Sequence, residues 1–177
     1  MKDYGWDEDI AARFEACAGP GLVPGRVVRQ ARDLSTLVTP LGELAAEVSG
    51  RFRHAAAGPA DFPVVGDWVA AEPHADGPAL IQALLPRRSA FARKAAGEEV
   101  EAQVAAANVD TVFLVTGLDG DYNLRRIERY LATAWSSGAA PVVVLNKADL
   151  REDLDEVVAE VERVAPGVPV VAASAVA

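Results

Sequence analysis

The second half of the chain alternates short apolar runs with longer segments that carry an apolar residue every three or four positions. Continuous apolar runs are typical of buried parallel strands, and the wider spacing is typical of amphipathic helices. The runs predict strands at 108–116, 141–145 and 168–172, and the spaced segments predict helices at 123–138 and 152–165. Right-handed crossovers would assemble this β-α-β-α-β series into a parallel sheet, with ligand loops at the carboxyl ends of its strands.

Each predicted helix has one apolar side. Asn123 is a suitable N-cap for the first helix, and Pro166-Gly167 ends the second. The apolar stripes are Leu124, Ile127, Leu131 and Trp135 in the first helix, and Leu154, Val157, Val158, Val161 and Val164 in the second. Asp and Glu residues separate the members of the second stripe, so this helix is expected to present an acidic outer face.

Residues 24–85 show a different pattern, in which short β-like runs are separated by turns rich in Gly and Pro. The runs lie at 26–31, 34–39, 43–48, 64–71 and 79–84. Five short strands fit an OB barrel, whose open face commonly takes oligonucleotides, and they also fit other small barrels. Before them, an apolar residue recurs every three or four positions, which predicts a short helix packed on the barrel. Its members are Trp6, Ile10, Phe14 and Cys17.

The tetrapeptide Asn146-Lys147-Ala148-Asp149 follows the apolar run 141–145 and points to guanine. Guanine presents adjacent N1–H and N2–H donors, which a single carboxylate can accept together and which adenine cannot match. Asp149 is therefore predicted to read the base. Asn146 would bond the acceptor edge of the base or brace the loop, and the aliphatic part of Lys147 would lie on the ring face. A plain polar loop after a core strand is the alternative.

A second loop follows the predicted strand at 168–172. Ala173-Ser174-Ala175 consists of small residues, so a backbone N–H can approach the guanine O6 without obstruction. By itself this tripeptide indicates no more than a small-residue loop. Both loops fall at the same edge of the predicted sheet, and we therefore add Ser174 and Ala175 to the predicted guanine site.

The sequence lacks a phosphate-binding motif. A P-loop nucleotide hydrolase needs Gly-x-x-x-x-Gly-Lys followed by Ser or Thr. No Gly-Lys-Ser or Gly-Lys-Thr occurs in the 177 residues, although 145 residues precede the guanine tetrapeptide. Either the chain is not a GTPase, or its motifs are permuted and the phosphate loop lies beyond Ala177.

Further motifs favour the permuted order. They are Gly66-Asp67-Trp68-Val69, Leu85-Pro86-Arg87-Arg88-Ser89 with Arg93-Lys94, Ala106-Ala107-Asn108-Val109-Asp110, the segment from Asn123-Leu124 to Arg129-Tyr130-Leu131, and the two loops above. With these residues the chain, from about Gly25 to Ala175, resembles the ribosome small-subunit-dependent GTPase A family of circularly permuted bacterial GTPases. The resemblance implies a β barrel of the OB fold followed by a partial, circularly permuted α/β domain of the P-loop NTPase kind, with a parallel sheet.

The same resemblance implies an organisation and a function. The regions would be an N-terminal helix and lead-in at 1–23, the OB barrel at 24–85, a basic connector at 86–99, and the guanine-specificity half of a GTPase domain at 100–177. GTP or GDP would be the nucleotide, and the small (30S) ribosomal subunit and its rRNA would be the partners. The parent protein would couple GTP hydrolysis to ribosome binding and assist late maturation of the subunit, while this chain alone would be inactive. Magnesium and structural zinc would bind only in a C-terminal part that this sequence lacks.

Charge is distributed unevenly along the chain. The net charge of −9 would argue against a nucleic-acid partner if it were uniform, yet residues 25–95 hold nine Lys or Arg against seven Asp or Glu. The predicted RNA-binding residues are Arg26, Arg29, Arg51 and Arg53 on or beside the barrel strands, and Arg87, Arg88, Arg93 and Lys94 in the connector. Because aromatic residues make up only 6% of the chain, we expect contacts to phosphates and shape rather than base stacking. Solvated surface charge is the alternative.

The remaining residues suggest no catalytic or metal site. Cys17 is the only cysteine, and His54 and His74 lie far from it, so neither an internal disulfide nor a zinc site is expected. Asp67 is predicted to cap a turn, and no catalytic residue is assigned. An RNA-binding module with vestigial nucleotide loops and an unrelated α/β nucleotide-binding enzyme are the alternatives to a GTPase.

The N-terminus and the apolar runs bear on location. Acidic residues within the first nine positions are incompatible with a secretory signal, and no apolar run approaches the roughly twenty residues of a membrane span. We expect a cytoplasmic protein with neither a membrane nor a DNA partner.

Overall fold

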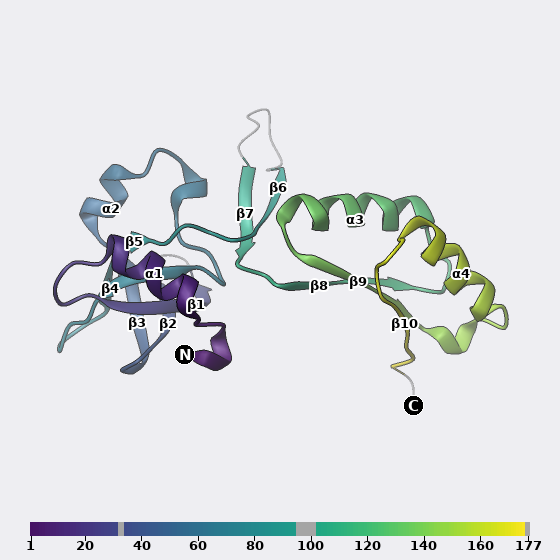
Figure 1. Ribbon diagram of the computed structural model, residues 1–177, viewed down its shortest axis with the longest axis horizontal. Coiled ribbons are helices and arrows are strands. Elements are labelled where there is room, and N and C mark those ends of the chain that lie inside the picture. The colour runs from purple at the N-terminus through teal and green to yellow at the C-terminus, as the bar shows by residue number, and fades with distance from the viewer. Residues whose placement is uncertain (32–33, 95–101, 176–177) are drawn as a thin grey trace. The chain divides into compact units, whose positions relative to one another are not determined.

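The computed structural model describes residues 1–31, 34–94 and 102–175. The chain divides into two compact units, Met1–Asn108 and Val109–Ala177 (Figure 1). The first unit is built around a β barrel and the second around a parallel sheet.

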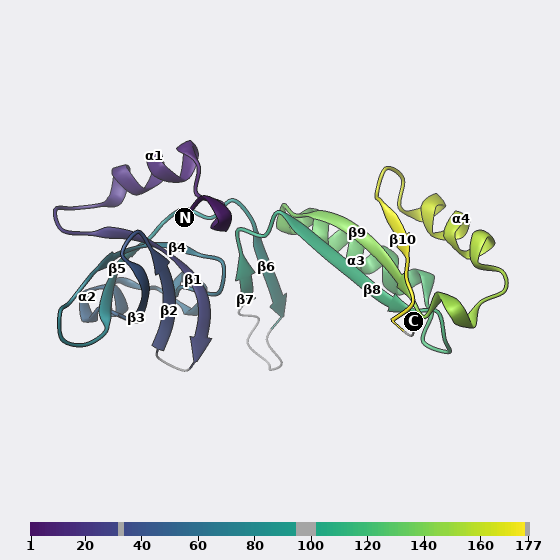
Figure 2. The same ribbon diagram turned by 90° about the horizontal axis from the view of Figure 1, so that it is seen from below.

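The barrel of the first unit is closed and has five strands (Figure 2). The strands are β1 (Val23–Ala31), β2 (Leu34–Thr39), β3 (Gly42–Val48), β4 (Trp68–Glu72) and β5 (Ala79–Leu84). They follow the order β1-β2-β3-β5-β4, β4 pairs back onto β1, and only β3 and β5 run parallel. This Greek-key order is that of the OB fold, so the predicted barrel is confirmed.

Two apolar clusters stabilise the first unit. The barrel interior is filled by Val27, Leu37, Ala46, Val69, Ala71, Ala79 and Ile81. The second cluster joins the outside of the barrel to helix α1 (Glu8–Cys17) through Ile10, Trp68, Ala70 and Leu85. Trp6 packs edge-on against Trp68 with ring centroids 5.2 Å apart. The predicted helix therefore packs on the barrel, but Cys17 lies exposed at its end.

The segment between β3 and β4 differs from the prediction. Helix α2 (Gly50–Ala55) follows Ser49, whose hydroxyl accepts a hydrogen bond from the Phe52 N–H at 3.1 Å, and the short 3-10 helix η2 covers Pro59–Asp61. Arg51 and Arg53 therefore lie on a helix. The predicted strand at 64–71 begins only at Trp68, because residues before it turn through Gly66 with a φ of 91°.

The predicted connector contains a strand. Strand β6 (Ala90–Lys94) pairs antiparallel with β7 (Ala102–Ala107), and this hairpin belongs to the first unit. A short run of alanines and charged residues gives little hydrophobic alternation, which explains why the sequence pattern did not indicate it.

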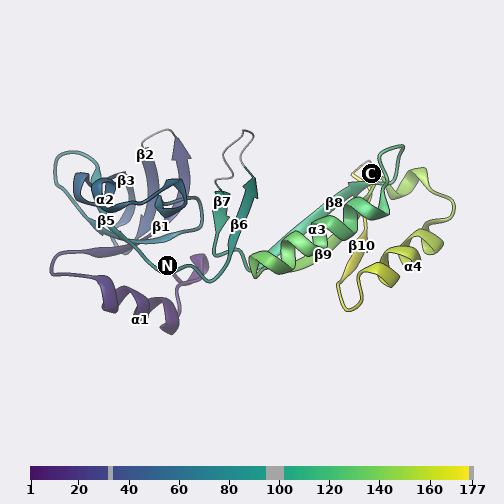
Figure 3. The same ribbon diagram turned by 90° about the horizontal axis from the view of Figure 1, so that it is seen from above.

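The second unit is a three-stranded parallel sheet with helices between its strands (Figure 3). The elements are β8 (Thr111–Gly117), α3 (Leu124–Ser137), β9 (Ala140–Asn146), the 3-10 helix η3 (Ala148–Leu150), α4 (Leu154–Val164) and β10 (Val170–Ala172), and the strand order is β10-β9-β8. The predicted β-α-β-α-β series is therefore confirmed.

Both helices pack into one core with the central strand. Val143 and Leu145 of β9 contact Ile127 and Leu131 of α3 and the valines of α4 in a single buried cluster. Asn123 caps α3 as predicted, with its Oδ1 accepting from the Arg126 N–H at 3.0 Å. Trp135 is 50% exposed, because the buried positions in the last turn of α3 are Ala134 and Ser137. Among the described residues, no helix has the length and apolar character needed to cross a membrane.

Candidate functional site

The carboxyl ends of the three parallel strands are joined by backbone hydrogen bonds. The Leu118 N–H after β8 donates to the Asn146 carbonyl of β9 at 2.8 Å. On the other side, the Ala148 N–H donates to the Ala173 carbonyl at 3.1 Å, and the Ala173 N–H donates to the Leu145 carbonyl at 2.9 Å. The two predicted guanine loops therefore lie side by side at one edge of the sheet, together with the turn that follows β8.

The Asn146–Asp149 loop turns sharply at Lys147. Lys147 adopts a left-handed conformation with φ of 61°, which is uncommon for a residue that bears a side chain. The Asn146 Oδ1 accepts a hydrogen bond from the Lys147 N–H at 2.9 Å and so stabilises this turn. Of the two roles predicted for Asn146, this hydrogen bond corresponds to the bracing of the loop, and the contact with a base stays a prediction.

Asp149 is held by the second loop. The Ser174 hydroxyl donates a hydrogen bond to the Asp149 Oδ1, although the two residues are 25 positions apart in the chain. Both residues are exposed, and so is Ala175. An exposed carboxylate that is oriented by a neighbouring hydroxyl keeps its remaining lone pairs for an external donor pair.

The structure adds Asp119, in the turn after β8, which was not among the predicted site residues. Its Oδ2 forms an ion pair with the Lys147 Nζ, and its Oδ1 accepts from the Asp121 N–H at 3.1 Å. The hydrogen bond with the Lys147 ammonium lowers the pKa of Asp119 and raises the pKa of Lys147. The available sequence signal was the position of Asp119 directly after a parallel strand, where ligand loops lie.

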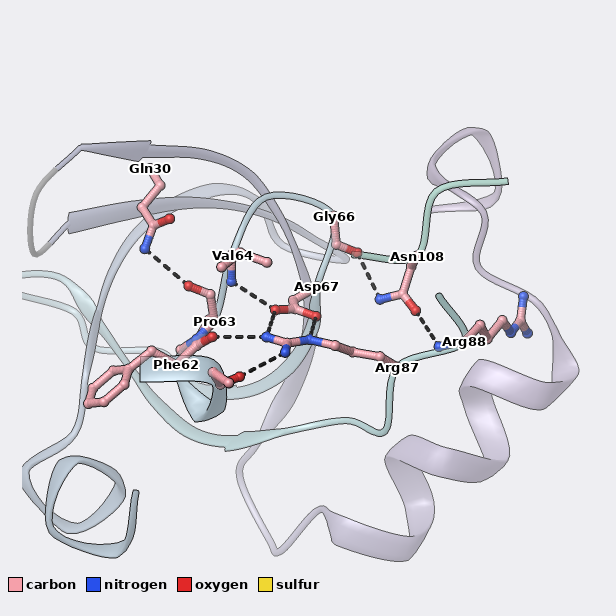
Figure 4. A network of polar contacts seen from close by, with 10 residues as sticks. Gln30, Phe62, Pro63, Val64, Gly66, Asp67, Arg87, Arg88 and Asn108 are labelled. Atoms are coloured by element: carbon pink, nitrogen blue, oxygen red, sulfur yellow. Dashed lines mark hydrogen bonds and ion pairs between the residues drawn. The ribbon is translucent and has the colours of Figure 1, made fainter. Parts of the chain in front are cut away.

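A buried ion pair lies in the first unit at the start of β4 (Figure 4). The Asp67 side chain is fully buried, and Arg87 donates to it from Nε at 2.8 Å and from Nη2 at 2.7 Å. Asp67 also accepts from the Val64 N–H at 2.8 Å, which confirms the predicted turn cap. The remaining Arg87 donors bond the Ala60 and Phe62 carbonyls, so the guanidinium is occupied within the protein.

The side chain of Asn108, the last residue of the first unit, is held by the neighbours of Asp67 and Arg87 (Figure 4). Its side chain accepts from the Arg88 N–H at 2.8 Å and donates to the Gly66 carbonyl at 3.0 Å. Only glycine fits at position 66, because its φ of 91° disfavours other residues and a Cβ would lie 2.0 Å from the Ala107 carbonyl oxygen.

The predicted RNA-binding residues fall into three groups. Arg26, Arg87 and Arg88 have partners within the protein. Arg26 donates to the Asn108 carbonyl at 3.0 Å and lies over the Trp68 ring, and Arg88 pairs with Asp7 and Asp9. The second group, Arg29, Arg51 and Arg53, is exposed. The third, Arg93 and Lys94, lies on β6, and these two side chains are outside the described part of the chain.

Arg51 also borders a concave surface. A groove of about 540 Å³ between α2 and β5 is lined by Arg51 together with Phe52, Gln82 and Leu84. His54 is exposed, and the His74 Nε2 lies 3.8 Å from a Glu72 carboxylate oxygen. Within the described ranges, no group of three or more His, Cys, Asp or Glu side chains is arranged to hold a metal ion.

Comparison with known proteins identifies relatives along nearly the whole chain. The chain is 47% identical to the small ribosomal subunit biogenesis GTPase RsgA of Opitutus terrae, over 99% of this chain and 50% of that protein. It is 45% identical to the protein of the same name from Streptomyces avermitilis, over 97% of this chain and 46% of that protein. The chain thus spans about half the length of the curated relatives it matches.

Two solved structures share the fold. YjeQ from Thermotoga maritima matches with a TM-score of 0.68 and 26% identity, over 86% of this chain and 52% of that chain. YloQ, described as a circularly permuted GTPase, matches with a TM-score of 0.66 and 17% identity, over 87% of this chain and 52% of that chain. The model of the RsgA GTPase family matches residues 84–177, a segment that contains both predicted guanine loops, and the chain therefore belongs to the RsgA GTPase family.

Proposed function

We propose that the chain is the N-terminal part of a GTPase that binds the small ribosomal subunit and assists its late maturation, with GTP hydrolysis coupled to ribosome binding. The chain would supply the RNA-docking barrel and the guanine-reading half of the nucleotide domain. The single observation that carries this proposal is the Asn146–Asp149 loop, which is braced from both sides at the carboxyl edge of a parallel sheet.

Asp149 is the proposed specificity residue. Its two carboxylate oxygens accept the N1–H and N2–H of guanine, and the Ser174 hydrogen bond to Oδ1 leaves lone pairs for both contacts. The Asn146 Nδ2 donates to the acceptor edge of the base, because its Oδ1 is already engaged by the Lys147 N–H. The Lys147 methylenes cover one ring face, and a backbone N–H at Ser174 or Ala175 bonds the guanine O6.

This sequence contains no motif that would bind the phosphates of GTP. GTP hydrolysis needs a phosphate loop and a magnesium ion, and no Gly-Lys-Ser or Gly-Lys-Thr occurs here. We therefore assign base recognition to this chain, and we assign phosphate, magnesium and zinc binding to a further part of the whole protein. The 177 residues alone are expected to bind nucleotide weakly and to hydrolyse none.

The barrel unit is the proposed site of docking on rRNA. Arg29, Arg51 and Arg53 are exposed, and the groove beside Arg51 offers a concave surface for backbone and sugar. Arg93 and Lys94 complete the proposed set. Arg26, Arg87 and Arg88 would shape this surface from within, because their donors bond protein oxygens. A protein that acts on the ribosomal subunit is expected in the cytoplasm.

A titration of the 177-residue chain followed by NMR tests the nucleotide assignment. GMP should shift the amides of Lys147, Asp149 and Ser174 with a Kd on the order of millimolar, whereas AMP should not. Asp149→Asn should exchange the preference for GMP for one for xanthosine monophosphate, because xanthine carries an oxygen where guanine carries its N2 amine. Equal responses to GMP and AMP, or an unchanged preference in the variant, would remove the guanine assignment.

A further inference from the structure

We infer that Asp119 is a positioning residue of the guanine site, which holds the Lys147 side chain in place before nucleotide binds. This inference rests on the proposed function of the Asn146–Asp149 loop. The observation behind it is that a carboxylate from the turn after β8 reaches across to the neighbouring loop and pairs with the Lys147 ammonium.

The two ends of Lys147 are both constrained. Its backbone is in the left-handed region and is braced by the Asn146 Oδ1, while its ammonium is held by Asp119. The four methylene groups between these anchors are thereby kept at the carboxyl edge of the sheet. A lysine is otherwise among the most costly side chains to order, so fixing both ends in advance reduces the entropy lost when the stem covers a base.

The turn after β8 is itself built to present Asp119. Its Oδ1 accepts from the Asp121 N–H, which orients the carboxylate and leaves Oδ2 for Lys147. Gly117 precedes it, and a Cβ at that position would lie 3.0 Å from the Asp119 Oδ1. The Leu118 N–H to Asn146 carbonyl bond then fixes the spacing of the turn from the guanine loop.

The pair is partly exposed, so its contribution is expected to be modest. The Lys147 side chain is 50% exposed and the Asp119 side chain 32%. Asp119→Asn should therefore weaken GMP binding about two- to fivefold, which lies within the range of an exposed ion pair. Glu162→Gln is the matched control, because it removes an exposed carboxylate on α4, outside the loops at the sheet edge, and it should leave GMP binding unchanged.

Lys147→Met tests whether Asp119 acts on GMP binding by positioning the Lys147 side chain or only by supporting the fold. Methionine keeps an apolar stem and lacks the ammonium that pairs with Asp119. Lys147→Met should weaken GMP binding about as much as Asp119→Asn, and Asp119→Asn should have no further effect in the Lys147→Met background. The ring-current shift that GMP induces on the Lys147 methylenes should shrink in Asp119→Asn. If Asp119→Asn does not fold, Asp119→Ser takes its place, because serine keeps an acceptor for the Asp121 N–H and lacks the carboxylate that pairs with Lys147.

The outcomes distinguish this inference from the function on which it rests. Selective GMP binding that is unchanged in Asp119→Asn or in Lys147→Met, or losses that add in the double variant, would overturn the positioning role alone. Loss of selectivity for GMP over AMP in the unaltered chain would instead remove the guanine assignment.

Discussion

The two units of this chain bury the apolar residues of their β-sheets in different ways. The barrel closes on itself, so all five of its strands have two partners and its apolar residues face a common interior. In the described part of the chain, α3 and α4 cover one face of the parallel sheet only, and the other face exposes Phe113 at 64%, Val115 at 59% and Val171 at 48%. Parallel sheets are normally covered on both faces, so the second unit is expected to be the less stable of the two.

The largest predicted effect is in the barrel unit. Asp67→Ala should lower its free energy of unfolding by about 3–5 kcal/mol, because it leaves the Arg87 guanidinium without its buried partner. Urea denaturation followed by Trp fluorescence would measure this loss, since Trp68 is buried in the same unit. Glu47→Ala, at an exposed acid on β3, is the control and should change stability by less than about 0.5 kcal/mol. A loss in Asp67→Ala below about 1 kcal/mol would show that the ion pair is not what fixes this corner.

The two faces of the parallel sheet should respond differently to substitution. Leu131→Ala removes a residue that is 1% exposed and should destabilise the second unit by about 2–5 kcal/mol. Phe113→Ser, on the bare face, should cost less than about 1 kcal/mol in the same chain. Thermal unfolding by circular dichroism would compare the two variants. A large loss in Phe113→Ser would mean that its ring is buried in solution, for instance by self-association.

Hydrogen exchange compares the units without substitution. The amides of Leu37 and Val69 in the barrel should exchange more slowly than those of Val143 and Leu145 in β9, because the open sheet unfolds at a lower free energy. A difference of about 1–2 kcal/mol in opening free energy is expected for a face left bare. Equal protection in the two units would contradict the comparison.

The exposed arginines of the barrel unit should affect RNA binding without affecting its stability. Changing Arg29, Arg51 and Arg53 together to Gln should weaken binding to small ribosomal subunits about tenfold. The slope of log affinity against log salt concentration should also fall by about one unit for each phosphate that is no longer neutralised. Filter binding at several salt concentrations measures both quantities. Arg125 and Arg129, changed to Gln on α3 in the second unit, are the control. Binding that is unaltered in the triple variant would exclude these residues from the interface.

The smallest effect is an acid-sensitive contact of α1. Hydrogen bonds from Arg88 and from the Ile10 N–H lower the pKa of Asp7 to about 2, from 3.8. Because the folded pKa is depressed, the stabilisation is present above pH 3.8 and is lost as the pH falls towards 2. Asp7→Ala should therefore flatten the stability profile of the first unit between those values, as measured by denaturation at several pH values. The pair is exposed, so a change at neutral pH as large as that of Asp67→Ala would contradict this account.

The sequence predicted the second unit better than the first. Strands and helices there have apolar patterns of distinct period, and the caps at Asn123 and Gly138 lie where local hydrogen bonding favours them. In the first unit, α2 and the β6–β7 hairpin escaped detection, because Ala-rich segments carry little hydrophobic contrast. Trp135 shows the opposite failure: its spacing fits the stripe of α3, but the buried face of the last turn is formed by Ala134 and Ser137.

By itself, the sequence determined the alternating strands and helices of the second unit and the donor and acceptor groups of the Asn146–Asp149 loop, because apolar periodicity and donor–acceptor patterns are local properties. Tertiary structure alone decided which charges are bound internally and which face outward. Arg87 and Arg53 look alike in the sequence, yet one is paired with a buried acid twenty positions away and the other is exposed. The pairing of Asp119 with Lys147, 28 positions apart, arises in the same way. Such partners come into contact only after the strands have paired in the tertiary structure, and no local sequence pattern specifies that pairing.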